Sequence, residues 1–422
     1  MNNVPPGYKQ TEVGVIPEEW KVKPFTQVTE LITCGIAATP KYVPESRGYP
    51  FLSSTNVKEG QIVWSGYKYI SADLHRQLYR NNPPKRGDIL YSRVGTFGEA
   101  AVVEVDFEFS VYVSLTLIKP GKSLDSFFLM QLLNSDAYKR RAKDQIYLGG
   151  GVGNLNVDVV RRYPIVVPPL PEQRAIATAL SDVDALLGAL DRLIAKKRDL
   201  KQAAMQQLLT GQTRLPGFHG EWEALKMSEK STLKARIGWQ GLTTAEYLRS
   251  GEYYLVTGTD FIDGRVNWSS CCFVAAFRYV QDSNIQLKPR DILLTKDGTI
   301  GKVGFVDSLP APATLNSGVF VIRPKGDAYD PLFFYHVLTS RIFEDFLNKL
   351  QAGSTISHLY QKDFVTFSFF APVTLAEQTA IAAVLTDMDA ELGALEQRLA
   401  KTRALKQGMM QELLTGRVRL IN

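Results

Sequence analysis

Two stretches of the chain place apolar residues at alternating steps of four and three, which is the pattern of a helix that packs along one seam. Gly211 and Gly416 follow the two patterns as helix stops. The pattern therefore predicts two long coiled-coil helices, over 169–211 and 373–416. The seam residues are Ile176, Leu180, Val183, Leu187, Leu190 and Ile194 in the first helix and Ile381, Leu385, Met388, Leu392, Leu395 and Leu399 in the second.

The rest of the chain has a different pattern, in which short runs rich in Val, Ile, Tyr and Phe alternate with Gly, Pro and Asn. Val111–Ile118 is one such run and predicts a strand. Late in each part we expect one longer helix, over Leu124–Lys143 and over Pro331–Leu350. The pattern predicts an α+β globular domain in residues 1–168 and another in residues 212–372.

The second half of the chain repeats the first. The run RGDILYSRVGTFG at 86–98 returns as PRDILLTKDGTIG at 289–301, with an offset of 291 − 88 = 203. The run PEQRAIA at 171–177 returns as AEQTAIA at 376–382, with an offset of 377 − 172 = 205. Because the offsets are nearly constant, we interpret the chain as a duplicated unit and expect two lobes related by a pseudo-twofold axis. Such an axis requires the two long helices to pack antiparallel; the alternative is that each helix lies on its own domain.

The expected fold class is therefore α+β, with two globular α/β domains separated by two long antiparallel coiled-coil helices in a pseudo-twofold internal repeat. Five parts follow one another along the chain. They are the first domain (1–168), the first long helix (169–211), the second domain (212–372), the second long helix (373–416) and a C-terminal tail (417–422).

The composition fits a cytoplasmic globular protein. The 422 residues are 45% hydrophobic and 22% charged, which is typical of globular domains. The apolar runs are too short to span a membrane, and the first ten residues lack the apolar core of a signal peptide. Three cysteines and four histidines are too few for a disulfide framework or a Cys/His zinc site, so we expect no metal.

The excess positive charge lies in the first half of the chain. The net charge is +6, and Lys and Arg outnumber Asp and Glu by 27 to 21 in residues 1–216 but equal them, 22 to 22, in residues 217–422. Lys139, Arg140 and Arg141 form one of the basic clusters. Such a cluster suits a polyanion, although a solvated basic face has the same composition.

Two motifs suggest an enzyme, and both fail in detail. Asn81–Pro84 resembles the Asn-Pro-Pro-aromatic signature of adenine-N6 methyltransferases, but Lys85 occupies the aromatic position, so base stacking is lost. The Gly149–Asn154 loop is not a dinucleotide fingerprint, because Asn154 replaces the third glycine. The sequence therefore predicts no catalytic residue and no cofactor.

The repeated turn offers groups that can bond to nucleic acid. Arg93 and Lys296 hold matching positions in it, followed by Thr96 and Thr299. Arg and Lys can hold phosphates or guanine edges, and Ser, Thr and Asn can bond to either; the alternative for each residue is an ordinary surface turn. The candidate DNA-binding residues are Arg93, Thr96, Lys139, Arg140, Arg141 and Asn154 in the first half and Lys296, Thr299, Ser354, Thr355 and His358 in the second.

Together these features resemble the specificity subunit of a type I restriction-modification enzyme. The resemblance rests on the opening from Tyr8 to Trp20, the repeated Asp-Ile-Leu…Gly-Thr-x-Gly turn, the proline-rich helix start at 168–173 and the Leu-Leu-Thr-Gly helix ends. It spans nearly the whole chain, although the second helix start, at 371–376, lacks the Pro-Pro-Leu-Pro of the first.

The resemblance implies a DNA-binding subunit with two target recognition domains, each reading one half of a split, asymmetric sequence in double-stranded DNA. Its central helices would dock two methylation subunits, to which motor-nuclease subunits add. Catalysis would belong to those partners, so this chain is expected not to be an enzyme. Two alternatives stay open, a self-sufficient DNA adenine methyltransferase and a structural scaffold for protein partners. The residues implied in partner binding are Glu172, Gln173, Arg174, Glu377 and Gln378.

Overall fold

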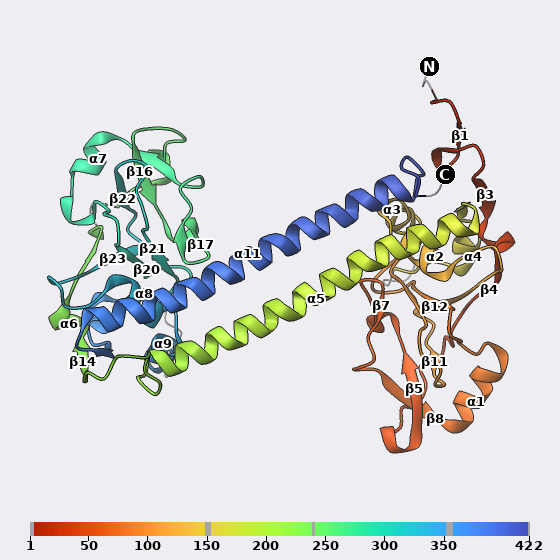
Figure 1. Ribbon diagram of the computed structural model, residues 1–422, viewed down its shortest axis with the longest axis horizontal. Helices are drawn as coiled ribbons and strands as arrows, with labels where there is room; N and C mark the ends of the chain where they lie inside the picture. Colours follow the sequence, from red (N-terminus) through yellow and green to blue (C-terminus); the bar gives the residue numbers. More distant parts are fainter. Residues whose placement is uncertain (1–3, 148–152, 239–240, 352–357, 421–422) are drawn as a thin grey trace. The chain divides into compact units, whose positions relative to one another are not determined.

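The computed structural model describes residues 4–147, 153–238, 241–351 and 358–420. The chain divides into two compact units. The first unit comprises Met1–Asp191 with Gln397–Asn422, and the second comprises Arg192–Glu396. Each unit contains one α/β domain and parts of two long helices (Figure 1), so the expected fold class is confirmed.

The first domain is built around an antiparallel four-stranded sheet with the order β10-β9-β12-β4. The central strand β9 reads as a continuous apolar run because both of its faces are covered. Ile89 and Tyr91 face one hydrophobic core, and Leu90 belongs to another. The strands are β1 Tyr8–Thr11, β2 Gly14–Pro17, β3 Lys21–Pro24, β4 Thr29–Cys34, β5 Gly48–Leu52, β6 Val57–Lys58, β7 Gln61–Ile62, β8 Lys68–Ser71, β9 Ile89–Ser92, β10 Ala100–Val102, β11 Ser110–Val111, β12 Leu115–Pro120 and β13 Pro164–Val167. The helices are α1 Ala72–Asn81, α2 Ser126–Leu133, α3 Asp136–Asp144 and α4 Val157–Arg161.

The second domain repeats this plan. Its main sheet has the order β15-β23-β20-β21-β18-β17, in which β20 pairs with β21 and β23 as β9 pairs with β10 and β12. The internal repeat therefore extends from sequence to strand pairing. The strands are β14 Trp222–Lys226, β15 Ser231–Ala235, β16 Tyr253–Val256, β17 Phe261–Ile262, β18 Arg265–Val266, β19 Cys272–Val274, β20 Ile292–Thr295, β21 Val303–Phe305, β22 Ala313–Leu315, β23 Val319–Pro324 and β24 Ser368–Pro372. The helices are α6 Met227–Lys230, α7 Ala276–Val280, α8 Pro331–Leu338, α9 Arg341–Gln351 and α10 Gln361–Phe364.

Two helices of 39 residues, α5 (Leu170–Leu208) and α11 (Leu375–Leu413), pass through the units. Within each unit, the start of one helix pairs with the end of the other. Residue numbers rise along one helix as they fall along the other, so the two helices run antiparallel. The matched ion pairs between them are Asp184–Lys406 and Asp191–Arg403 in the first unit and Asp389–Lys201 and Glu396–Arg198 in the second.

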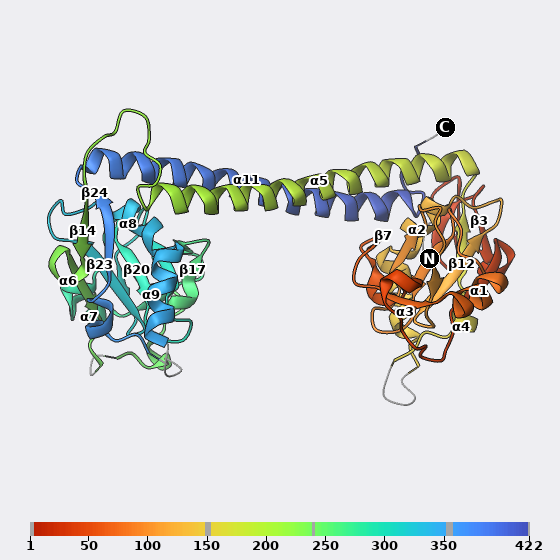
Figure 2. The same ribbon diagram turned by 90° about the horizontal axis from the view of Figure 1, so that it is seen from below.

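Each long helix begins on the core of its own domain. Ile176 and Leu180 belong to the first core, together with Leu413 from the end of α11. In the second unit, α8 lies between α11 and the main sheet (Figure 2). Among the predicted seam residues, the buried ones are Ile176, Leu180, Leu190, Ile194, Ile381, Leu385 and Leu399, and the half-buried ones are Val183, Leu187, Met388, Leu392 and Leu395.

The single helix expected at the end of each domain is wrong in both places. Residues 124–143 form α2 and α3, and residues 331–350 form α8 and α9. The breaks fall at matching serines. Ser135 Oγ donates to the Leu132 carbonyl, and Ser340 Oγ donates to the Val337 carbonyl, both at 2.7 Å. A hydroxyl that bonds to a nearby carbonyl competes with the helical hydrogen bonds, so the chain turns here.

The strand expected over 111–118 is also interrupted. β11 ends at Val111 and β12 begins at Leu115. Ser114 lies in the turn between them, and its Oγ accepts a hydrogen bond from the Ser54 amide at 2.9 Å. This long-range contact explains why local periodicity did not reveal the break. Among the described residues, no helix combines the length and apolarity needed to cross a lipid bilayer.

Candidate functional site

The repeated turn connects three segments of the first domain. The Arg93 amide donates to the Ser114 carbonyl at 3.0 Å, and the Leu155 amide donates to the Arg93 carbonyl at 2.9 Å. We call this meeting point of the turn, the segment before β12 and the segment at Leu155 the first turn junction. It joins residues that are more than 60 positions apart, so the turn fixes the tertiary structure around it.

The Arg93 side chain lies inside this junction. It is 6% exposed. Its Nε donates to the Leu155 carbonyl at 2.9 Å, and its Nη1 donates to the Val113 carbonyl at 3.1 Å. The guanidinium is therefore engaged by carbonyl groups of its own domain and is not presented at the surface.

The second turn junction has the same backbone contacts. The Lys296 amide donates to the Gly318 carbonyl at 2.9 Å, and the Leu359 amide donates to the Lys296 carbonyl at 2.8 Å. Here a side-chain hydrogen bond between His358 Nδ1 and Asp297 Oδ1 crosses the junction. The structure thus brings the predicted residues Lys296 and His358 together.

The second glycine of each turn allows a helix to approach it. Gly98 and Gly301 have positive φ angles of 79° and 84°. A Cβ atom at Gly98 would lie 3.0 Å from Ala142 Cβ in α3, and one at Gly301 would lie 2.5 Å from Leu347 Cδ1 in α9. Both the conformation and the space therefore require glycine. This part of the repeated motif is explained by packing.

The aspartate of the motif is structural as well. Asp88 accepts a hydrogen bond from the Lys85 amide at 2.8 Å and pairs with Lys119. Burial raises the pKa of Asp88, and the bonds from Lys119 and Lys85 partly offset that rise. Asp291 holds the same position in the second domain and pairs with Arg323. The motif therefore anchors β9 and β20 ahead of the turns.

Other predicted residues lie around the junctions. Thr96 and Thr299 are exposed in the two turns. Asn154 pairs through its backbone with Tyr147 beside the first junction, and Tyr147 is 72% exposed. The predicted residues Ser354 and Thr355 lie outside the described residues.

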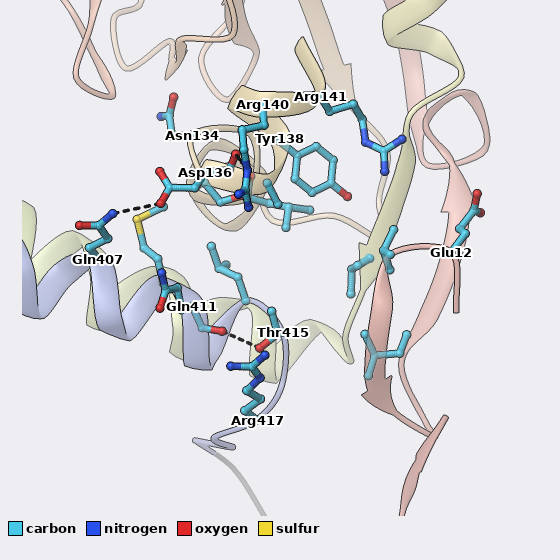
Figure 3. A pocket seen from close by; sticks show the side chains of 18 residues that line it. Glu12, Asn134, Asp136, Tyr138, Arg140, Arg141, Gln407, Gln411, Thr415 and Arg417 are labelled. Atoms are coloured by element: carbon cyan, nitrogen blue, oxygen red, sulfur yellow. Dashed lines mark hydrogen bonds between the residues drawn. The ribbon is translucent and has the colours of Figure 1, made fainter. Parts of the chain in front are cut away.

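The basic cluster of α3 divides between two surroundings. Lys139 pairs with Glu99 at 2.6 Å, directly after the first turn. Arg140 and Arg141 instead line a hollow of about 500 Å³ near the end of α11 (Figure 3). The three residues are therefore not one continuous basic surface.

This hollow lies within the first unit, between α3, the end of α11 and the β1–β2 hairpin, from which Glu12 comes. Gln407 of α11 donates to Asp136 of α3 at 3.0 Å, as Figure 3 shows. Tyr138 donates its hydroxyl hydrogen to the Pro164 carbonyl, and burial raises the pKa of this phenol. The wall of the hollow is therefore partly held by contacts within the chain.

A tryptophan and an arginine hold the start of α5. The Glu172 side chain is fully buried. It accepts hydrogen bonds from Trp20 Nε1 at 2.9 Å and from Arg419 Nη2 at 2.8 Å. The bonds to Glu172 raise the pKa of Arg419, which stays charged. We call Trp20, Glu172 and Arg419 the first helix lock.

An arginine–glutamate pair at the matching positions holds the start of α11 in the second unit, where the tryptophan contacts the arginine and not the glutamate. Arg214 donates to Glu377 through Nε at 2.5 Å and through Nη2 at 2.6 Å. Its guanidinium carbon lies 5.8 Å from the centroid of the Trp222 ring. Hydrogen bonding to Glu377 raises the pKa of Arg214. Arg214, Trp222 and Glu377 form the second helix lock.

The glutamine after each locked glutamate ties the long helix to a domain helix. Gln173 accepts from the Asp125 amide at 2.9 Å, and Gln378 accepts from the Asp330 amide at 2.8 Å. Asp125 and Asp330 are the N-caps of α2 and α8. The residues implied in partner binding therefore have different surroundings. Arg174 is exposed, and Glu172, Gln173, Glu377 and Gln378 are buried in contacts within the chain.

Sequence reasoning missed the locking role of the two arginines and the two tryptophans. The signal was present, because each arginine and each tryptophan has its counterpart in the repeat. The sequence does not reveal which glutamate each arginine binds. Glu172 and Arg419 are separated by 247 positions, so only the tertiary structure brings them together.

One histidine is buried between helices of the second unit. His336 of α8 bonds through Nε2 to Thr386 Oγ1 of α11 at 3.0 Å. Burial lowers the pKa of His336 to about 3, and the nearby charges of Lys201 and Arg265 act in the same direction. His336 is therefore neutral at physiological pH. In the parts of the chain that the structure describes, no three His, Cys, Asp or Glu residues gather as a metal site.

Comparison with known proteins points to a single family. The type I restriction modification DNA specificity domain matches residues 17–196 and 245–402. Two curated proteins of Methanocaldococcus jannaschii are similar along nearly their whole length. The putative type I restriction enzyme MjaX specificity subunit is 24% identical over 98% of this chain and 97% of its own. The type I restriction enzyme MjaVIII specificity subunit is 23% identical over 96% of this chain and 95% of its own.

Two solved structures share the fold. The S subunit of a type I restriction-modification system from M. genitalium has a TM-score of 0.62 at 16% identity, covering 93% of this chain and 96% of its own. A chain from work on complex assembly and conformational transition of the type I R-M system has a TM-score of 0.56 at 16% identity. The match covers 96% of this chain and 99% of the other. With the family matched over most of its length, this chain belongs to the type I restriction-modification DNA specificity family and is a specificity subunit.

Proposed function

We propose that this specificity subunit reads a split, asymmetric sequence in double-stranded DNA, with one domain on each half. The observation that carries the proposal is the pair of turn junctions, which share their backbone contacts but differ in their side chains. A duplicated fold suits two half-sites, and different side chains suit two different base sequences. The proposed target is therefore asymmetric.

Polar and basic groups beside the turn junctions are the proposed DNA contacts. The exposure of Thr96 and Thr299 supports their inclusion. The larger number of basic residues in the first half supports a larger share of phosphate contacts there. The proposed contacts are Thr96, Lys139, Arg140, Arg141 and Asn154 in the first domain and Lys296, Thr299 and His358 in the second, while Ser354 and Thr355 remain predictions from sequence.

The proposed partners are two methylation subunits, docked on the long helices and their flanks, with motor-nuclease subunits added for cleavage. Arg174 is the implied docking residue whose exposure supports this role. The buried residues of the two locks would act indirectly, by fixing each helix start. In this proposal the chain recognises DNA and its partners carry the catalysis. The solved relative described in work on complex assembly supports such partners.

The test is to co-express this chain with the methylation subunit encoded beside it and to map the methylated adenines in the host DNA. We expect one split motif with two different halves and a fixed spacing. Absence of both a stable complex and such a motif would contradict the proposal and favour a scaffold for other protein partners.

A second measurement addresses the enzymatic alternative. If the isolated chain were a self-sufficient adenine methyltransferase, it would bind S-adenosylmethionine. We expect no binding in calorimetric titration of the isolated chain and methylation only when the methylation subunit is present. Methyl transfer by the isolated chain would overturn this assignment of roles.

A further inference from the structure

We infer that Arg93 is a positioning residue for recognition by the first domain, and that the hydrogen bond between Asp297 and His358 has the corresponding role in the second domain. The inference rests on the proposed function, because it concerns how each domain presents its DNA-contacting groups. It deepens that function by assigning a different stabilising contact to each half of the target.

Arg93 connects segments that are distant in the chain. Its amide and carbonyl bond to Ser114 and Leu155, and its guanidinium bonds to the carbonyls of Leu155 and Val113. Asn154, a proposed DNA contact, directly precedes Leu155. The position of Asn154 therefore depends on the contact between Arg93 and Leu155.

This linkage is specific to arginine. A guanidinium is a planar fork whose donors point in several directions, whereas lysine carries a compact ammonium on a flexible stem. Because Arg93 is buried, the carbonyls that it binds also replace the hydration lost by its charge. A shift of Leu155 would weaken the hydrogen bonds of the guanidinium and the replacement of its lost hydration. The guanidinium and the segment before Leu155 therefore hold each other in place.

The second domain has lysine at the matching position. The Lys296 ammonium lies 5.5 Å from the centroid of the Phe320 ring, a cation–π contact. The residue before Leu359 is instead held by its side chain, because His358 Nδ1 pairs with Asp297 Oδ1. Both junctions share two backbone hydrogen bonds, and the side chains that hold them differ. Each half-site should therefore respond to its own substitutions.

The experiment uses the complex of this chain with its methylation subunits. Methylation rates are measured on duplexes that carry the recognised motif and on duplexes with one base changed in either half. We expect Arg93→Lys to lower discrimination against changed bases in one half on the order of tenfold, through loss of one charged hydrogen bond. We expect Asp297→Ala, which removes the group bonded to His358, to lower discrimination in the other half only.

The matched control is Arg86→Lys in the first domain, because the Arg86 side chain is 62% exposed. It should leave discrimination in both halves unchanged. Thermal unfolding of each complex is measured in parallel. A purely structural role for Arg93 would lower the melting temperature and slow methylation of all duplexes alike, and that result would overturn the inference.

The remaining outcomes are equally decisive. The inference would also be overturned if both variants affected the same half of the target. It would likewise be overturned if neither variant changed discrimination. Arg93→Lys keeps the buried positive charge, so the test does not depend on a variant that removes this charge and fails to fold. If the unmodified complex methylates no split motif, the proposed function itself fails, and that result is separate from any effect of the variants.

Discussion

At the scale of single residues, the two halves of the chain differ at a buried polar position that the repeat places in both. Gln131 and His336 occupy matching positions in α2 and α8. Gln131 donates to Asp184 of α5 at 2.8 Å, whereas His336 bonds to Thr386 of α11. The duplicated backbone therefore carries a neutral amide at one position and a titratable ring at the other. Only the second unit should be sensitive to acid through this position.

We predict that His336→Gln weakens the acid sensitivity of the second unit. An unfolded histidine titrates near pH 6.5, whereas the pKa of folded His336 is about 3. Below pH 6.5 the unfolded state binds a proton that the folded state does not, so the free energy of unfolding falls by about 1.4 kcal/mol per pH unit toward pH 3.

The measurement is urea unfolding of the original chain and of His336→Gln at pH 7 and pH 5. The original chain should lose about 2 kcal/mol more than the variant over this interval. Gln131 shows that the fold accepts glutamine at the matching position of the other domain. An identical loss in both proteins would contradict the assignment of a neutral buried imidazole.

At the scale of elements, the helix locks determine how α5 and α11 attach to the domains. Each lock brings together the start of one long helix, the segment after the end of the other and a tryptophan beside the domain. The buried glutamate would be left without its charge partner if the arginine were removed. The locks therefore couple helix pairing to domain folding.

We predict that Arg419→Ala destabilises the first unit by about 2–3 kcal/mol, because it leaves the buried Glu172 carboxylate with fewer donors. Hydrogen exchange of β13 and the start of α5 measures the effect. The control is Arg417→Ala, whose side chain is 66% exposed and whose removal should change stability by less than about 0.5 kcal/mol. If the amides of β13 and the start of α5 were equally protected from exchange in both variants, the lock would be excluded as a stabilising contact.

The elements also show what sequence can predict. The long helices follow from local apolar spacing, and the repeat follows from direct comparison of the two halves. The sequence predicts one helix across Ser135, because helix-forming residues stand on both sides of it and no proline or glycine marks the break. The sequence makes Arg93 a candidate DNA contact, because nothing local reveals that the Leu155 carbonyl, 62 positions away, accepts a hydrogen bond from its guanidinium.

At the scale of the whole molecule, the proposed function makes helix length part of DNA specificity. Removing residues 188–194 and 393–399 together deletes one matched heptad from each helix and keeps the seam in phase. Seven residues occupy about 10 Å of helix. We therefore predict a spacing between the two half-sites that is shorter by about 3 base pairs.

Mapping of methylated adenines again provides the measurement. The half-site sequences should stay the same while their spacing changes. The control deletes only 188–194, which puts the ion pairs of α5 out of register with α11 and should abolish methylation. An unchanged spacing in the double deletion would show that the helices do not set the separation of the half-sites.

The first helix lock also has a consequence for synthesis. Trp20 and Glu172 emerge from the ribosome early, but their partner Arg419 is translated after every residue of the second lock. Until then Glu172 lacks its partner Arg419, and the start of α5 lacks the end of α11. The domain that is translated first is therefore the last to reach its final structure.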